Sequence, residues 1–247
     1  MELSEFFERH PKLALGFSGG TDSAYLLYEA VQNGVDVRPY YVHAQFQPQF
    51  ELDDARRLCD QLGVELAVIP VDVLSDERVH SNPKDRCYWC KSQLFGAILE
   101  RARADGYAEI MDGTNASDDA GDRPGMRVLK EMCVLSPLRL CGITKPEVRA
   151  RSRAAGLFTH DKPAYACLAT RIPTGMAIEP DVLQKVERAE NALMRMGYRD
   201  FRVRVTAEGA KLQLRPEQMD RLLAERERIY ELLRPDFGTV VLDLKAR

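Results

Sequence analysis

Residues 13–23 have the sequence Leu-Ala-Leu-Gly-Phe-Ser-Gly-Gly-Thr-Asp-Ser, and this stretch decides the fold. The apolar run 13–17 predicts a short buried strand, and the segment 24–30 after the loop predicts a helix. Unpaired backbone N–H groups and the positive end of the helix dipole meet in the loop between them, which favours binding of a phosphate. Gly19 and Gly20 let an anion approach the backbone closely. Further donors come from three hydroxyl side chains, those of Ser18, Thr21 and Ser23.

The loop 18–23 does not end in Gly-Lys-Ser or Gly-Lys-Thr, so it is not the phosphate loop of an ordinary P-loop NTPase. It resembles the pyrophosphatase loop, Ser-Gly-Gly-x-Asp-Ser, of the ATP pyrophosphatase (PP-loop) superfamily. Enzymes of that superfamily cleave ATP between the α- and β-phosphates and activate a substrate by adenylylation. The resemblance implies that residues 18–23 bind ATP and that Asp22 is a catalytic residue that helps to hold Mg²⁺. A glycine turn without a ligand is the alternative.

A second candidate nucleotide segment is Asp112-Gly-Thr-Asn115, which follows a predicted strand. A strand end with this sequence can present backbone and amide groups to a nucleotide, although Gly-Thr-Asn is also ordinary turn chemistry. Together with the first loop it matches the second nucleotide-side segment of the superfamily. That match implies that Gly113 and Thr114 contact ATP.

The composition indicates a globular protein of one large or two modest domains. The chain has 247 residues, of which 45% are hydrophobic and 30% charged, enough apolar side chains for a substantial core. No apolar run approaches the length of a membrane span, and the acidic N-terminus is unlike a signal peptide, so we expect a cytoplasmic protein without a membrane partner. The formal net charge of -3 argues against a large nucleic-acid footprint.

The first two-thirds of the chain alternates strand-like and helix-like segments. After the opening strand and helix come predicted strands at 36–43, 64–70 and 109–113 and predicted helices at 51–63 and 91–105. This alternation predicts an α/β fold with a doubly wound, mostly parallel sheet that binds ligands at the carboxyl ends of its strands. We assign residues 1–175 to this domain.

The alternation ends near residue 176, and the pattern of the remaining residues predicts a small α+β domain at 176–247. We expect helices at 181–196 and 216–233 and strands at 201–205, 210–214 and 238–244. No flexible linker is evident between the two domains. The second domain is a candidate for substrate binding and for contacts in an oligomer.

Six cysteines in an apparently cytosolic chain favour metal or redox chemistry over structural disulfides. Cys87 and Cys90 are three residues apart where a loop meets a helix, so both can bind one metal ion or cluster. Arg86 and Lys91 would favour their thiolate forms. A redox dithiol and a zinc site are the alternatives.

A third thiol, Cys167, lies in a short polar-flanked loop close to Arg171. Three thiolates on a cluster would leave one iron open, which suits catalysis better than a closed four-cysteine site. The other cysteines are in helix-like or apolar contexts, and we assign them to the core; they are Cys59, Cys133 and Cys141.

Taken together, these segments resemble the LarE family of ATP-dependent sulfur transferases over nearly the whole chain. Those that carry the resemblance are the loop 18–23, Asp112–Asn115 with Asp122–Gly125, Ser136–Arg139, Thr144–Arg149, Lys162–Gly175 and Phe201–Arg204. In this family the substrate is pyridinium-3,5-biscarboxylic acid mononucleotide. Its carboxylates are adenylylated by ATP and converted to thiocarboxylates for the nickel-pincer nucleotide cofactor.

The resemblance also implies roles for individual residues. Some members sacrifice one cysteine near the position of Cys167, whereas others bind a 4Fe-4S cluster with three cysteines; Cys87, Cys90 and Cys167 match the second kind. Substrate contacts are expected from five residues: Arg171, Arg202, Arg204, Glu190 and Trp89. Members of the family form homo-oligomers, hexamers among them, and need a source of sulfide.

Three alternatives stay open. Cys167 could itself be a sacrificial sulfur donor. The chain could be another PP-loop enzyme, such as a tRNA thiolase or an amide-forming ligase, although neither a glutaminase segment nor a long basic extension is visible. It could also be a metal-binding sensor whose nucleotide site is regulatory.

Overall fold

The computed structural model describes residues 1–118 and 124–245. By its internal contacts the chain divides into two units. Unit 1 consists of Met1–Val73 and Asp85–Lys162, and unit 2 of Leu74–Lys84 and Pro163–Arg247.

The division falls at Pro163, whereas the sequence predicts a boundary near residue 176. It also joins residues 74–84 to unit 2. Backbone hydrogen bonds explain this, because Gly175 N–H donates to the Asn82 carbonyl and Ile178 N–H to the His80 carbonyl, both at 2.8 Å. A short segment from the middle of the sequence is thereby tied to the C-terminal unit.

The elements of unit 1 are, in chain order, α1 (Leu3–Arg9), β1 (Lys12–Gly16), α2 (Thr21–Gln32), β2 (Asp36–His43), α3 (Gln49–Leu62), β3 (Ala67–Pro70), α5 (Arg86–Ala104), β4 (Ile110–Asp112), α6 (Pro124–Glu131), α7 (Pro137–Leu140), α8 (Lys145–Ala154) and the 3₁₀ helix η2 (Phe158–Asp161). The 3₁₀ turn η1 (Val73–Ser75) lies where the two units meet in sequence.

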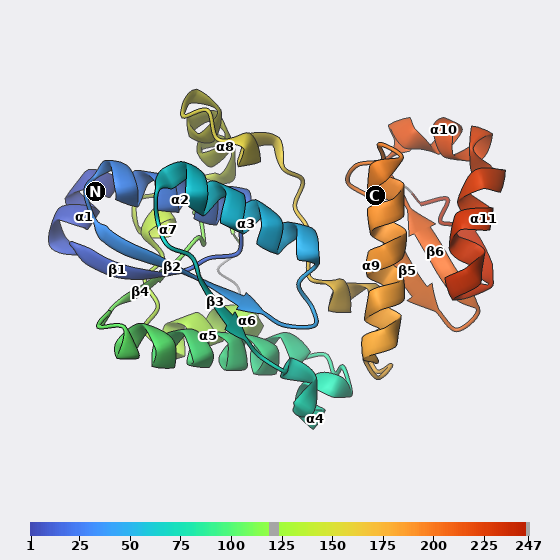
Figure 1. The fold of residues 1–247 in the computed structure, drawn as a ribbon, viewed down its shortest axis with the longest axis horizontal. Helices are drawn as coiled ribbons and strands as arrows, with labels where there is room; N and C mark the ends of the chain where they lie inside the picture. The colour runs from blue at the N-terminus through green and yellow to red at the C-terminus, as the bar shows by residue number, and fades with distance from the viewer. Residues whose placement is uncertain (119–123, 246–247) are drawn as a thin grey trace. The chain divides into compact units, whose positions relative to one another are not determined.

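The four strands of unit 1 form one sheet in the order β3-β2-β1-β4, and every neighbouring pair is parallel. Helices α2 and α3 cover one face of the sheet, and α5 and α6 cover the other (Figure 1). The predicted α/β class with a parallel sheet is thus confirmed. The loop 18–23 and the segment after Asp112 both follow carboxyl ends of strands, and β1 and β4 are neighbours in the sheet.

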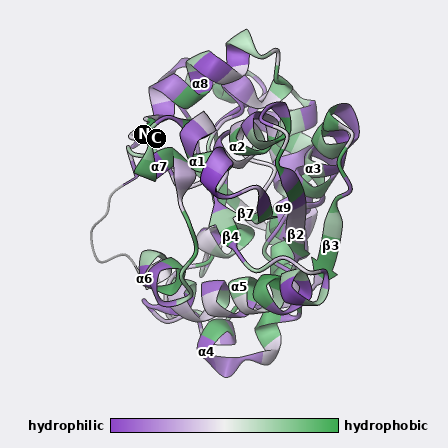
Figure 2. Cartoon of the chain, turned by 90° about the vertical axis from the view of Figure 1, so that its left-hand side faces the viewer, coloured by the Kyte–Doolittle hydropathy of each residue, from purple (hydrophilic) through white to green (hydrophobic). Residues whose placement is uncertain are grey.

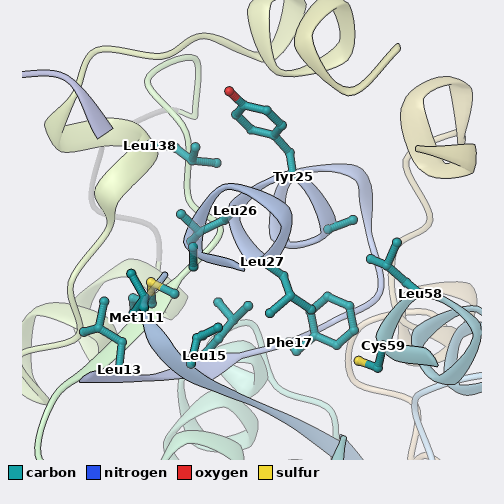
Figure 3. Close-up of a cluster of buried hydrophobic side chains, with 14 of the residues drawn as sticks. Leu13, Leu15, Phe17, Tyr25, Leu26, Leu27, Leu58, Cys59, Met111 and Leu138 are labelled. Carbon is teal, nitrogen blue, oxygen red and sulfur yellow. The ribbon is translucent and has the colours of Figure 1, made fainter. Parts of the chain in front are cut away.

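The core of unit 1 is built around β1 and α2. Leu13 and Leu15 of β1 and Leu26 and Leu27 of α2 are fully buried, and Figure 3 shows these side chains packed between the strand and the helix. Burial of each such leucine contributes about 1.5–3 kcal/mol. This packing holds β1 and α2 in place relative to each other, and the phosphate loop connects them.

Hydropathy follows the layers of unit 1. In Figure 2 strand β3 is mainly green, and helix α8, whose surface is mostly charged, is mainly purple. Helix α8 begins with a capping box between Thr144 and Glu147 and has Pro146 in its first turn, which together fix where it starts. None of the helices in the described ranges has both the length and the apolar character required to cross a bilayer.

Unit 2 contains α4 (Glu77–His80), η3 (Leu168–Arg171), α9 (Pro180–Arg195), β5 (Arg202–Thr206), β6 (Gly209–Gln213), η4 (Pro216–Gln218), α10 (Met219–Ala224), α11 (Arg226–Phe237) and β7 (Thr239–Leu242). Its sheet has the order β5-β6-β7, with β5 antiparallel and β7 parallel to β6. The three predicted strands are confirmed, and the predicted helix 216–233 is divided into η4, α10 and α11.

The assignment of three cysteines to the core is only partly correct. Cys59 is buried in the core of unit 1 (Figure 3), and burial raises the pKa of its thiol to about 12. Cys141 is half-buried against the same core. Cys133 is exposed, and the prediction for it was wrong. Its φ of 54° places it in a left-handed turn two residues after the end of α6.

Candidate functional site

The phosphate loop 18–23 is held tightly against α3. Gly19 has a φ of 69°, in the left-handed region. A Cβ at this position would lie 3.0 Å from the Glu51 carbonyl oxygen and 3.3 Å from Ala55 Cβ. Both the backbone conformation and the contact with α3 therefore require glycine here.

The three hydroxyl groups of the loop are engaged within the protein. Ser18 Oγ lies 3.1 Å from Ser23 Oγ, and the Ser23 hydroxyl is 3.2 Å from the Gly20 carbonyl. The buried Thr21 hydroxyl donates to the Thr159 carbonyl at 2.9 Å. In this conformation the side chains shape the loop, and the backbone N–H groups at the start of α2 remain the natural donors to a phosphate.

The second predicted nucleotide segment meets the first at Gly113. A Cβ on Gly113 would lie only 2.8 Å from the Ser23 backbone nitrogen and 3.2 Å from the Asp22 carbonyl carbon. The end of β4 therefore touches the first turn of α2, and the sequence segments 18–23 and 112–115 form one continuous surface. This closeness supports their proposed joint role.

The Asp112 carboxylate organises the turn that contains Thr114. It accepts hydrogen bonds from the Thr114 hydroxyl at 2.5 Å and from the Ser136 hydroxyl at 2.7 Å. Asp112 and Thr114 are both buried. The Thr114 N–H also donates to the Asp112 carboxylate at 3.3 Å, so the turn is held by both the side chain and the backbone of Thr114, and its contact with a nucleotide stays a prediction.

We predict that Gly113→Ala weakens nucleotide binding. The added methyl group would meet backbone atoms of the first turn of α2, which cannot move without displacing the phosphate loop. We expect a loss of about 1–3 kcal/mol of stability, typical of overpacking, and weaker binding of an ATP analogue. Urea denaturation and calorimetric titration measure the two effects. The control is Gly96→Ala in α5, where a Cβ meets nothing within 4 Å; it should be neutral or stabilising.

Asp22 is paired with a lysine that the sequence analysis did not single out. Lys145 Nζ lies 2.6 Å from Asp22 Oδ2, and both side chains are about three-quarters buried. Asp22 Oδ1 is buried and has no hydrogen-bond partner among the described residues. The Lys145 N–H donates to Ser117 Oγ at 2.9 Å, which links the start of α8 to the turn after β4. An unsatisfied carboxylate oxygen next to the phosphate loop fits the proposed Mg²⁺ site.

Cys87 and Cys90 lie in the first turn and a half of α5, because this helix begins at Arg86 and not at Lys91 as predicted. Residues three apart in a helix face the same side, so both thiols can reach one metal. Cys87 is exposed and Cys90 is buried. An Arg86 guanidinium N–H donates to Cys87 Sγ at 3.5 Å. These cationic surroundings suit thiolate ligands.

Lys91 is close enough to Cys87 and to Asp112 to interact with both electrostatically. Burial lowers the pKa of its ammonium group, and the nearby charges of Asp112 and Cys87 partly offset that effect. Trp89, a predicted substrate contact, donates its indole N–H to the Asp85 carboxylate at 3.1 Å and packs edge-on against Tyr88. Its contact with substrate stays a prediction.

In unit 2 the predicted residues Arg171 and Glu190 form a buried ion pair. Arg171 Nε and Nη2 donate to the two Glu190 carboxylate oxygens at 2.8 and 2.9 Å. Glu190 also accepts the Val203 N–H at 2.9 Å and the Tyr165 hydroxyl. Each side chain is 1% exposed or less. Loss of one partner of such a pair typically costs 3–5 kcal/mol.

The remaining donors of Arg171 hold the loop that contains Cys167. Its Nη1 donates to the Ala166 carbonyl at 2.8 Å and to the Thr170 hydroxyl at 2.9 Å. In this conformation Arg171 therefore positions the cysteine loop. Whether it also contacts substrate stays a prediction, as it does for Glu190.

Arg202 and Arg204 come from one strand and reach the same loop. Arg202 Nη2 donates to the Ala164 carbonyl at 2.6 Å, and Arg204 Nη1 donates to the Thr170 carbonyl at 2.7 Å. Arg204 Nε also donates to the Gln213 amide oxygen. The guanidinium of Arg202 lies 5.3 Å from the centre of the Tyr165 ring. Two cations are thus concentrated beside the segment around Cys167, where an anionic substrate would be attracted.

The proposed metal ligands come from both units, Cys87 and Cys90 from unit 1 and Cys167 from unit 2. Within the described residues there is no group of three or more His, Cys, Asp or Glu side chains that could hold a metal ion. The three-cysteine site therefore stays a prediction. The Asp122–Arg123 part of the sequence resemblance lies outside the described residues.

Two lysines of the site were missed by sequence reasoning. Lys145 pairs with Asp22, and Lys162 donates to the Gly19 carbonyl of the phosphate loop at 3.2 Å. Both belong to segments quoted for the family resemblance, at Thr144–Arg149 and at Lys162–Gly175. A positively charged residue in such a segment could have been noted from the sequence. Its partner in the phosphate loop could not, because the two are far apart in the sequence.

Comparisons with known proteins identify relatives over most of the chain. No protein-family model matches the chain. An uncharacterized protein of Synechocystis sp. is 36% identical over 227 residues, which cover 90% of this chain and 84% of that protein. The pyridinium-3,5-bisthiocarboxylic acid mononucleotide synthase of Lactiplantibacillus plantarum is 28% identical over 236 residues, 94% of this chain and 86% of that enzyme. The tRNA-specific 2-thiouridylase MnmA of Thermobifida fusca is 28% identical over 188 residues, 62% of this chain and 51% of that enzyme.

Proposed function

We propose that this chain, which belongs to the family of the Synechocystis protein, is an ATP-dependent sulfur transferase of the PP-loop superfamily. The proposal is supported by its similarity to the Lactiplantibacillus plantarum synthase and to the tRNA 2-thiouridylases. Its proposed substrate is pyridinium-3,5-biscarboxylic acid mononucleotide, whose carboxylates become thiocarboxylates for the nickel-pincer nucleotide cofactor. One observation carries the choice of substrate. Similarity to the Lactiplantibacillus plantarum synthase covers 94% of this chain and 86% of that enzyme, so it includes both units.

The first proposed step is adenylylation. A substrate carboxylate oxygen attacks the α-phosphorus of ATP, the bond from that phosphorus to the bridging oxygen breaks, and pyrophosphate leaves with the electron pair. The backbone N–H groups of the phosphate loop would bind the departing pyrophosphate. Asp22 would help to hold Mg²⁺ through its unpaired oxygen, and Lys145 supplies a second positive charge beside it. The product is a mixed anhydride with AMP.

The second proposed step is sulfur transfer. A sulfur nucleophile attacks the activated acyl carbon, the carbon–oxygen bond to AMP breaks, and AMP leaves with the electron pair. The sulfur stays on the carbon as a thiocarboxylate. The arginines of β5 would attract the anionic substrate to the Cys167 loop, which Arg171 holds in place.

We assign the sulfur supply to a 4Fe-4S cluster bound by Cys87, Cys90 and Cys167. When bound, such a cluster would hold an exogenous sulfide at the iron that no cysteine ligates. The donor chemistry fits in part, because two thiols share one helix face beside Arg86 and Lys91. A sacrificial Cys167 is the competing source.

We predict that anaerobically purified protein contains iron and acid-labile sulfide in equal amounts. Incubated with the pyridinium mononucleotide, ATP and sulfide, it should form thiocarboxylate and AMP. Cys87→Ser should lose most of the iron, whereas Cys133→Ser, at an exposed cysteine that is not among the proposed ligands, should keep it. A colourless protein that binds stoichiometric zinc would overturn the cluster assignment, and failure to consume ATP with this substrate would overturn the function.

A tRNA 2-thiouridylase is the second candidate, because several relatives carry that name. The matched region is only 51% of the Thermobifida fusca enzyme, against 86% of the Lactiplantibacillus plantarum synthase. The net charge of -3 also provides little attraction for tRNA. Thiolation of unmodified tRNA in the presence of ATP and sulfide would establish it.

We also propose that the protein is a homo-oligomer that associates through unit 2. Leu223 and Val241 are about half exposed and line an apolar groove of about 360 Å³ beside the edge strand β7. An exposed apolar groove next to an unpaired strand edge is typical of an association surface.

A further inference from the structure

The chain that leaves unit 1 is fastened to the phosphate loop by a lysine that the proposed reaction does not use. Lys162 is the last residue of unit 1. Its Nζ lies 3.2 Å from the Gly19 carbonyl oxygen and 2.7 Å from Asp54 Oδ2 on α3. Its side chain is only 13% exposed, and the ammonium group also lies 5.4 Å from the centre of the Phe50 ring.

The contact with the Gly19 carbonyl has a direct consequence for phosphate binding. In a trans peptide the C=O and N–H groups point in opposite directions, and the described residues contain no cis bond. By holding the Gly19 oxygen, Lys162 fixes the direction of the Gly20 N–H, which in this conformation makes a long hydrogen bond of 3.4 Å to Ser18 Oγ. Gly20 is the N-cap of α2, where backbone N–H groups are available to bind a phosphate.

Two further contacts fasten the same segment of chain. The Thr21 hydroxyl of the loop donates to the Thr159 carbonyl at 2.9 Å. Arg149 of α8 donates to the carbonyls of His160 and Lys162 at 2.7 and 2.8 Å. Residues 159–162 are therefore bound on one side to the phosphate loop and on the other to α8.

We propose that Lys162 is a positioning residue that links occupancy of the phosphate loop to the conformation of residues 159–162, the segment with which unit 1 ends. A nucleotide that binds the Gly20 N–H stabilises the peptide orientation that Lys162 requires. By linkage, the same nucleotide stabilises the anchored conformation of residues 159–162. The inference rests on the proposed function only in that the loop binds ATP.

The test compares Lys162→Met, Lys162→Arg and the unchanged protein with a non-hydrolysable ATP analogue and Mg²⁺. We expect Lys162→Met to lower the affinity for the analogue about 10-fold, which is within the usual range for coupled sites. Lys162→Arg should recover much of the affinity, because a guanidinium can also donate to Gly19 and Asp54. Lys12→Met is a matched control: Lys12 pairs with Asp36 at 3.5 Å and lies 4.7 Å from the Tyr107 ring centre, at the amino end of β1. It should bind the analogue normally.

Hydrogen exchange supplies a readout that a purely structural role would not move. In the unchanged protein the analogue should slow amide exchange in residues 159–162, and in Lys162→Met, at saturating analogue, that protection should be lost. Equal affinity together with unchanged protection in Lys162→Met would overturn the inference and leave the proposed function standing. No binding of the analogue by the unchanged protein would instead refute the proposed function.

Discussion

Replacement of Cys167 by alanine should abolish sulfur insertion while pyrophosphate release continues. Both proposed sulfur sources need this thiol, either as the third ligand of the cluster or as the donor itself. Adenylylation depends instead on the phosphate loop and Asp22, which belong to unit 1. We expect thiocarboxylate formation to fall by about 10³-fold or more, the scale seen when a group essential to a chemical step is removed. Pyrophosphate release should stay within about threefold of normal.

The two sulfur sources are separated by intact mass after turnover of the unchanged protein. A sacrificial Cys167 breaks its Cβ–Sγ bond, loses the elements of hydrogen sulfide and becomes dehydroalanine after one turnover. A cluster that holds exogenous sulfide leaves the mass unchanged through many turnovers.

For the Cys167→Ala variant, Cys133→Ala is the matched control, because Cys133 is exposed and follows α6. If Cys167→Ala forms thiocarboxylate at the normal rate, neither source is correct.

The fold of unit 1 could be predicted from the sequence because its signals are local. Apolar runs such as Leu13–Phe17 specify buried strands, and the glycines of the loop specify where a strand gives way to a helix. The start of α5 was placed too late, since the residues 86–90 are too few to show a helical periodicity of their own. The exposed position of Cys133 depends on one left-handed residue, for which a cysteine gives no signal.

The candidate site was predictable only in part, because its contacts join distant residues. The resemblance pointed to Asp22, but its partner Lys145 is far away in the sequence. Likewise Arg171 and Glu190 were expected to contact substrate, and their mutual ion pair could not be deduced from the sequence, in which they are 19 residues apart. Sequence patterns indicate which face a residue occupies, whereas pairing depends on how the helices and strands pack.

Asp22→Asn should suppress substrate-dependent pyrophosphate release with little change in stability. The substitution keeps the shape of the side chain but removes the charge that would hold Mg²⁺ and that pairs with Lys145 at 2.6 Å. Loss of one group that stabilises the charge forming in the transition state commonly reduces turnover by about 10²–10³-fold, and we expect an effect of that size. Raised Mg²⁺ should restore part of the rate if Asp22 is a metal ligand.

The matched control is Asp36→Asn, which removes an aspartate paired with a lysine in the same unit but at the amino end of β2. An exposed pair of this kind contributes at most about 1 kcal/mol, so both activity and stability should be near normal. Thermal denaturation of both variants checks that neither has unfolded. One Asp22 carboxylate oxygen pairs with Lys145, and the other is buried without a hydrogen-bond partner among the described residues. If Asp22 had only a structural role, its replacement would lower the stability of the protein more than its activity. Normal pyrophosphate release by Asp22→Asn would exclude the metal role and would leave Lys145 as the charge that acts on the phosphates.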